Sequence, residues 1–150
     1  MTRYEIVRVS SREGEVNDRV RLAKAERVHR QLRPQIPGDY VATMLRILAS
    51  GAQMAVALDG DEVAGLALFR LIENTHVGRK LYVDDLVTDS ERRSSGVGHA
   101  LIVFLEAEAR HFECVSLDLD SGTQREQAHK FYFREGFTVK AFSFSKPLPG

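Results

Sequence analysis

Hydrophobic and polar positions in the first third of the chain predict one strand followed by two helices. A strand is expected over residues 4–9, where apolar and polar residues alternate. A first helix, capped by Asn17 or Asp18, is expected to run to about Arg30. One face of this helix carries four residues at helical spacing: Leu22, Ala25, His29 and Leu32. A second helix begins after the cap residue Asp39 and ends at Gly51.

The middle of the chain predicts three antiparallel strands. Apolar runs are expected to form strands over residues 53–58, 63–72 and 80–88. Asp59-Gly60 lies between the first two and is a strong hairpin signal, while residues 74–78 form the next turn. Consecutive strands joined by such short turns pair antiparallel.

The stretch over residues 81–111 organises the rest of the chain. It predicts a strand, a basic turn with two glycines, and an amphipathic helix. A glycine-bearing turn that feeds a helix leaves several backbone N–H groups pointing at one spot, where the helix dipole adds partial positive charge. Gly96 and Gly98 permit close backbone approach, and Arg92 and Arg93 add full charges. The turn therefore predicts a pyrophosphate site; His99, which follows it, could touch phosphate but more simply occupies a solvated helix position.

The last third predicts strand, helix and strand, over residues 114–119, 125–135 and 137–146. The strand over residues 80–88, the helix that follows the basic turn and the strand over residues 114–119 form a passage whose length suits a parallel crossover. The predicted fold class is thus α/β: a mixed, mainly antiparallel central sheet flanked by helices, in a single domain over residues 1–150.

Composition narrows the possible functions. The chain has 43% hydrophobic and 28% charged residues, and its 21 basic and 21 acidic residues cancel. A zero net charge argues against a chain built to coat nucleic acid or an anionic membrane. The N-terminus has no long apolar run, so we expect no signal peptide. No stretch approaches the length of a membrane span, and we expect a cytoplasmic protein. One cysteine, Cys114, excludes an internal disulfide, and the five histidines show no metal-ligand spacing.

Two motifs resemble those of the GNAT superfamily of acetyl-CoA-dependent N-acetyltransferases. Arg93-x-x-Gly96-x-Gly98, opening a helix after a strand, is similar to that family's pyrophosphate motif. Residues 128–137 resemble its C-terminal A-x-x-x-Y-x-x-x-G-F pattern, with one strand between the two motifs. The element order matches as well, so the resemblance covers nearly the whole chain.

The resemblance implies how the cofactor is held. Acetyl-CoA is the expected co-substrate, and main-chain groups of Leu86, Val87 and Thr88 are expected to pair with its pantetheine arm. One N–H near this point polarises the thioester carbonyl. The expected pyrophosphate cradle spans Arg92, Arg93, Ser94, Ser95, Gly96, Val97, Gly98 and His99. Arg125 stands where many members have asparagine, and it either reaches the cofactor or leaves that contact to residues 119–123.

The resemblance also implies the chemistry. A primary amine, from a small molecule or a peptide, attacks the thioester directly in a ternary complex. Asp84 is the first candidate for general base, since it shares a strand face with Tyr82, opposite Asp85. Asp85 is the rival, because a β-bulge would swap the faces; both aspartates could instead pair with arginines. Tyr132 is the candidate general acid for the departing thiolate.

Other functions fit less well. A non-catalytic CoA-binding regulatory module on the same fold is the main alternative. A Rossmann-type nucleotide domain is disfavoured because the glycine turn comes late, after an antiparallel hairpin. No metal site is expected, and a homodimer is possible because it is common in the family.

Overall fold

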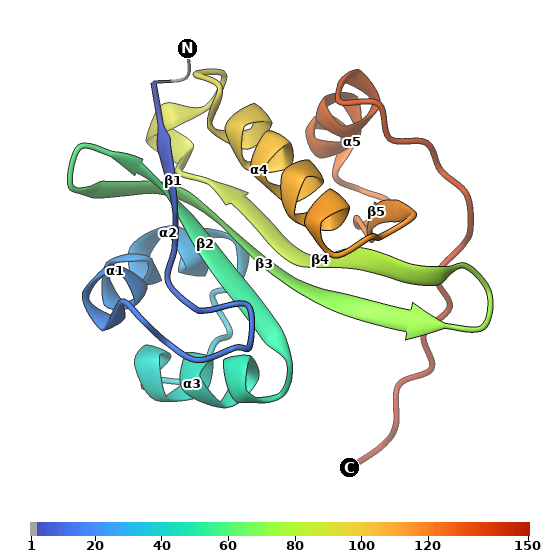
Figure 1. Ribbon diagram of the computed structural model, residues 1–150, viewed down its shortest axis with the longest axis horizontal. Coiled ribbons are helices and arrows are strands. Elements are labelled where there is room, and N and C mark those ends of the chain that lie inside the picture. Colours follow the sequence, from blue (N-terminus) through green and yellow to red (C-terminus); the bar gives the residue numbers. More distant parts are fainter. Residues whose placement is uncertain (1–2) are drawn as a thin grey trace. The chain divides into compact units, whose positions relative to one another are not determined.

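The computed structural model describes residues 3–150, which form two units divided after Leu119. The first unit contains a five-stranded sheet in chain order, β1-β2-β3-β4-β5 (Figure 1). Its strands are β1 (Glu5–Arg8), β2 (Ala52–Asp59), β3 (Glu62–Asn74), β4 (Gly78–Thr88) and β5 (Ser116–Leu119). The first three junctions are antiparallel and the junction of β4 with β5 is parallel, so the predicted mixed, mainly antiparallel sheet is confirmed.

The helices of this unit begin where the sequence places capping side chains. They are α1 (Arg19–Lys24), α2 (Glu26–Leu32), α3 (Tyr40–Ala49) and α4 (Val97–His111). Asp18 caps α1 by accepting from the N–H of Arg21, and Asp39 caps α3 by accepting from that of Ala42. One helix was expected from Asp18 to about Arg30, but the structure has two helices there. Ala25 is both the C-cap of α1 and the N-cap of α2.

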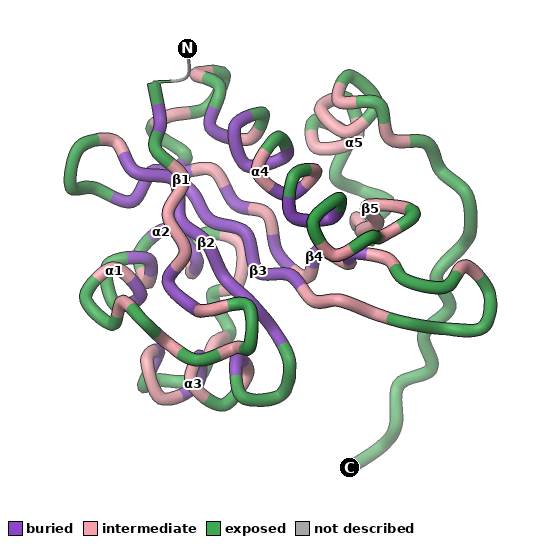
Figure 2. The backbone as a smooth tube through the Cα atoms, viewed as in Figure 1, coloured by how far each residue is buried: buried purple, intermediate pink, exposed green. Residues whose placement is uncertain are grey.

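The alternation of side chains in β3 separates the two faces of the sheet. Leu66 and Leu68 point into a core with α1–α3, which includes Leu22, Tyr40 and Met44. Gly65, Ala67 and Phe69 alternate with them and point toward α4, where Phe69 meets the ring of Phe104. The buried segments run along the central strands and the inner side of α4 (Figure 2).

Gly65 lets α4 begin close to the sheet. A Cβ at this position would lie 2.5 Å from Cγ1 of Val97 and 2.7 Å from the carbonyl oxygen of Val87. Real carbon atoms do not approach so closely, so only glycine fits without displacing the first residue of α4. The position of the helix N-terminus therefore depends on a missing side chain in β3.

The second unit contains α5 (Glu126–Arg134), followed by chain without regular structure. None of its residues is buried, and Figure 2 shows no buried segment there. The strand predicted over residues 137–146 is wrong, and Val139, Phe142 and Phe144 are exposed. Residues 120–150 contain no other strand with which the segment could form a ladder, and a strand cannot satisfy its backbone groups alone.

No helix within residues 3–150 has both the length and the apolar character required to cross a bilayer.

Candidate active site

The turn between β4 and α4 has the backbone of an anion-binding loop. Gly96 is the N-cap of α4 with a φ of +96°, and Ser94 has a φ of +64°. Gly96 has no side chain with which to cap this end of the helix, and the main-chain N–H groups of Val97 and Gly98 come before Ala100, which donates to the carbonyl of Gly96. Arg93, Ser94 and Gly96 are exposed. These main-chain donors and the helix dipole together favour an anion at this point.

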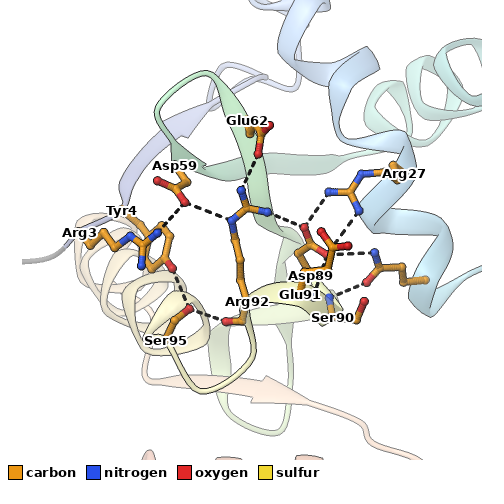
Figure 3. A network of polar contacts seen from close by, with 11 residues as sticks. Arg3, Tyr4, Arg27, Asp59, Glu62, Asp89, Ser90, Glu91, Arg92 and Ser95 are labelled. Carbon is orange, nitrogen blue, oxygen red and sulfur yellow. Dashed lines mark hydrogen bonds and ion pairs between the residues drawn. The ribbon is translucent and has the colours of Figure 1, made fainter.

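Arg92 anchors this turn to the β2–β3 hairpin. Its guanidinium donates to Asp59 at 3.2 Å, Glu62 at 2.5 Å and Asp89 at 2.8 Å (Figure 3). Glu62 is the main cause of a raised pKa for Arg92. The charge of Arg92 is thus taken up by carboxylates, whereas the Arg93 side chain has no ion-pair partner among the described residues.

Asp89 holds the start of the turn from inside the protein. Its side chain is 0% exposed and accepts from Arg27 at 2.7 Å and from Gln31 at 3.2 Å, as well as from Arg92. The Arg27 guanidinium, more than any other group, holds the pKa of this carboxyl well below its usual range. At the other end of the turn, Ser95 bonds the carbonyl of Arg92 and the hydroxyl of Tyr4. The turn is therefore fixed to several elements before any ligand binds.

A β-bulge lies in β4 at Asp84. Asp85 pairs with Leu68 and Val83 pairs with Phe69, which leaves Asp84 without a partner in β3. Because the bulge shifts the alternation, Asp85 lies on the same face as Tyr82, toward α2. The expectation that Asp85 lies opposite Tyr82 is therefore wrong, and the alternative of a face-swapping bulge is what the structure shows.

Asp85 is the centre of a buried polar chain. One carboxylate oxygen lies 2.7 Å from Nε2 of His29, and the other accepts from Arg33 at 2.8 Å. Nδ1 of the buried His29 lies 2.8 Å from the hydroxyl of the buried Tyr40. Burial raises the pKa of Asp85, but the bonds from His29 and Arg33 outweigh it and the net shift is downward. Burial raises the pKa of Tyr40 well above its usual value. Asp85 is thus ionised with both oxygens occupied.

Asp84 differs from its neighbour. Its Oδ2 accepts from Nε of Arg70 at 2.9 Å, and its side chain is 23% exposed. Its Oδ1 has no hydrogen bond among residues 3–150. Both aspartates pair with arginine, as the alternative interpretation expected, but only Asp84 keeps an oxygen for a ligand.

The edge of β4 that faces β5 is open beyond the bulge. β5 pairs with residues 80–83 of β4, from Lys80 opposite Ser116 to Val83 opposite Leu119. In the described part of the chain no strand pairs with the following residues on that edge. The main chain at Leu86, Val87 and Thr88 thus has β3 on one side and no strand on the other.

Tyr132 lies in α5, within the second unit. Its ring packs against those of Phe131 and Phe137, with centroids 5.5 and 5.6 Å away. Burial raises the pKa of the Tyr132 hydroxyl, while the hydrogen-bonding guanidinium of Arg125 opposes the shift. Tyr132 therefore carries its proton at neutral pH, and Arg125, at the N-cap of α5, contacts this hydroxyl.

Sequence reasoning missed the partners of the two aspartates: His29, Arg33, Tyr40 and Arg70. One signal was present, since a histidine on an otherwise apolar helix face requires a buried partner. No group of histidine, cysteine or acidic side chains suited to a metal ion occurs within the described residues.

Comparisons with known proteins identify relatives of this chain. The acetyltransferase (GNAT) family model matches residues 22–137. The uncharacterized N-acetyltransferase YhdJ of Bacillus subtilis is 36% identical over 96 residues, covering 54% of this chain and 68% of that protein. The aminoalkylphosphonate N-acetyltransferase of Salmonella typhimurium is 28% identical over 103 residues, covering 68% and 67%.

Solved structures show the same fold at low identity. An aminoglycoside acetyltransferase from an uncultured soil metagenomic sample, in complex with sisomicin, has a TM-score of 0.80 at 17% identity over 97% of both chains. A Trypanosoma brucei acetyltransferase has a TM-score of 0.73 at 23% identity, covering 97% of this chain and 99% of that one. The chain belongs to the acetyltransferase (GNAT) family and is an acyltransferase.

Proposed function

We propose that this protein transfers an acetyl group from acetyl-CoA to a primary amine by direct attack in a ternary complex. The observation that carries the proposal is the uncapped N-terminus of α4, whose turn follows directly from an unpaired edge of β4. Main-chain donors at residues 93–98 bind the pyrophosphate, and Leu86, Val87 and Thr88 offer the open edge to the pantetheine arm. An N–H near the bulge then polarises the thioester carbonyl, a contribution of about 3 kcal/mol in other acyl-transfer sites.

The reacting amine binds at Asp84. The free Oδ1 of Asp84 accepts a hydrogen bond from the ammonium form of the substrate, and the ammonium then loses one proton to this carboxylate or to water. The neutral nitrogen attacks the carbonyl carbon, the C–S bond breaks, and Tyr132 gives its proton to the departing thiolate. The nitrogen loses a second proton to solvent as the amide forms, and Tyr132 takes up a proton from solvent in turn. Asp85 acts through its position, because both of its oxygens are already bonded.

Coupled measurements test this proposal. Calorimetry with CoA and acetyl-CoA measures cofactor binding, and thiol release with a panel of amines measures turnover. Tyr132→Phe is expected to lower kcat by about 100-fold at an unchanged KM for acetyl-CoA, since only proton donation is lost. A thermal melt of the variant checks that it is folded.

The outcomes separate the alternatives. Absence of binding heat with both cofactors would remove the proposal. Binding without turnover of any amine would support a non-catalytic CoA-binding module instead. The single domain over residues 1–150, the homodimer and the cytoplasmic location stay predictions from the sequence.

A further inference from the structure

Two arginines beside the β4 bulge have unused hydrogen-bond donors. Arg33 follows α2 and Arg70 lies in β3, and both contact Asp84. From this arrangement we infer that the acceptor is a zwitterion: a primary amine that also carries a carboxylate, phosphonate or phosphate group. The inference rests on the proposed function, because it assigns the substrate class at the same site.

Each guanidinium uses only one of its edges within the protein. Arg33 places Nε and Nη2 on Oδ1 of Asp85, each at 2.8 Å, and Nη2 also lies 3.4 Å from the carbonyl oxygen of Asp84. Arg70 places Nε and Nη2 on Oδ2 of Asp84 at 2.9 and 2.8 Å. Nη1 of both arginines makes no bond among the described residues, and the side chains are 43% and 31% exposed.

Arg92 is an example of an arginine whose side-chain nitrogen atoms all have partners within the protein. All three of its nitrogen atoms lie on carboxylates, and its side chain is 17% exposed. Arg33 and Arg70 are more exposed and keep a terminal NH2 group each. Such groups match the planar oxygens of carboxylate, phosphonate and phosphate.

The charges of the site select for a zwitterion. Two arginines and two aspartates sum to zero, so the site has no net attraction for a cation or an anion alone. The free Oδ1 of Asp84 suits the ammonium, and the two Nη1 groups suit an anionic group on the same molecule. A polyamine would place a second positive charge near two guanidinium groups, which repel it.

Matched acceptors test the inference at saturating acetyl-CoA. One pair is 2-aminoethylphosphonate against ethylamine, a second is β-alanine against its amide, and spermidine serves as the polyamine. The zwitterion of each pair is expected to exceed its partner in kcat/KM by at least about tenfold, because charge-assisted hydrogen bonds are lost in the partner.

Arginine variants locate the effect. Arg33→Gln and Arg70→Gln are each expected to raise the KM for the zwitterion by about tenfold, and to leave the KM for the matched plain amine within about twofold. Arg79→Gln is the control, since Arg79 is 42% exposed and contacts Glu73 and the carbonyl of Phe112 at the other end of β4. It is expected to change neither value.

Each result has one meaning. Equal or better turnover of plain amines or spermidine would overturn the inference and leave the proposed function intact. An unchanged preference in both glutamine variants would do the same. Absence of turnover with every amine would overturn the proposed function and the inference with it.

Discussion

Two regions, the turn after β4 and the bulge within β4, carry the proposed chemistry in different ways. At the end of the strand, the turn at residues 93–98 offers main-chain donors, and its side chains serve mainly to hold it in place. At the bulge, the groups proposed to face the ligand are the side chains of Asp84, Arg33 and Arg70. The turn is the proposed site of the acyl donor, and the bulge is the proposed site of the acceptor.

Distant residues hold both regions in place, since Tyr4 bonds Ser95 from 91 positions away, but the two regions differ in the groups that are proposed to face the ligand. The two glycines of the turn, Gly96 and Gly98, are separated by one residue, so a short motif describes its main chain. The bulge is supported by residues from α2, α3 and β3, up to 56 positions away in the case of His29 and Asp85. A main-chain site can thus be predicted from a short sequence motif, whereas a side-chain site depends on the tertiary fold.

The largest expected effect separates the adjacent aspartates at the bulge. Asp85→Asn is expected to lower the free energy of unfolding by about 2 kcal/mol, because it weakens a buried chain that includes His29. Asp84→Asn, at a partly exposed ion pair, is expected to cost less than about 1 kcal/mol. Urea denaturation measures both, and equal losses would show that the bulge does not distinguish the two positions.

The same variants should differ in the opposite sense in catalysis. Asp84→Asn is expected to lower kcat/KM for the amine more than Asp85→Asn does at 20 °C, since only Asp84 has a free carboxylate oxygen. A larger loss of turnover in Asp85→Asn, measured on folded protein, would assign the base to Asp85 instead.

Acidification tests the ionised state of Asp85. Its pKa in the folded protein is lowered, relative to about 3.9 in the unfolded chain, so its ionised form stabilises the fold above about pH 4. That contribution is lost as the pH falls from about 4 through the folded value, at a slope of at most about 1.4 kcal/mol per pH unit for one carboxyl. Unfolding free energies at several pH values should therefore decline less steeply in Asp85→Asn than in the wild type, and parallel curves would contradict this.

A pair of glycine variants tests the main-chain site. Gly96→Ala and Gly78→Ala both place a side chain at positive φ, +96° and +87°, in open space. Each is expected to cost about 1 kcal/mol of stability. Only Gly96→Ala is expected to weaken CoA binding measured by calorimetry, because Gly78 begins β4 at the opposite end of that strand from the turn. Equal affinities in the two variants would show that the turn is not the phosphate site.

The smallest effect is expected from the anchor of the turn. Arg92→Gln removes bonds to three carboxylates and loosens the turn, so CoA should bind a few-fold more weakly. The preference between zwitterionic and plain amines should stay the same in this variant, since the bulge is untouched. A changed preference would show that the two regions are coupled.

The sequence predicted most of the sheet and the helix caps, because alternation and capping are local. It placed the turns at Gly60 and Gly78 and the cap Asp39 correctly, and Asp18 was one of its two candidates for the first cap. It gave the bulge at Asp84 only as an alternative, because a bulge depends on the pairing of β4 with β3. The prediction of a strand over residues 137–146 is wrong, because alternation of apolar and polar residues alone does not supply a hydrogen-bonding partner.

Alternate residues of β3 support the two proposed sites, the donor site at the start of α4 and the acceptor site at the bulge. Its odd-numbered positions from Gly65 to Phe69 support the helix that begins the donor site, and the even-numbered Arg70 reaches toward the acceptor. Inserting or deleting one residue between them would exchange inward and outward positions for the rest of the strand. The proposed acceptor preference can therefore diverge by point substitution at Arg70, while a frame change within this short segment would disable both proposed sites together.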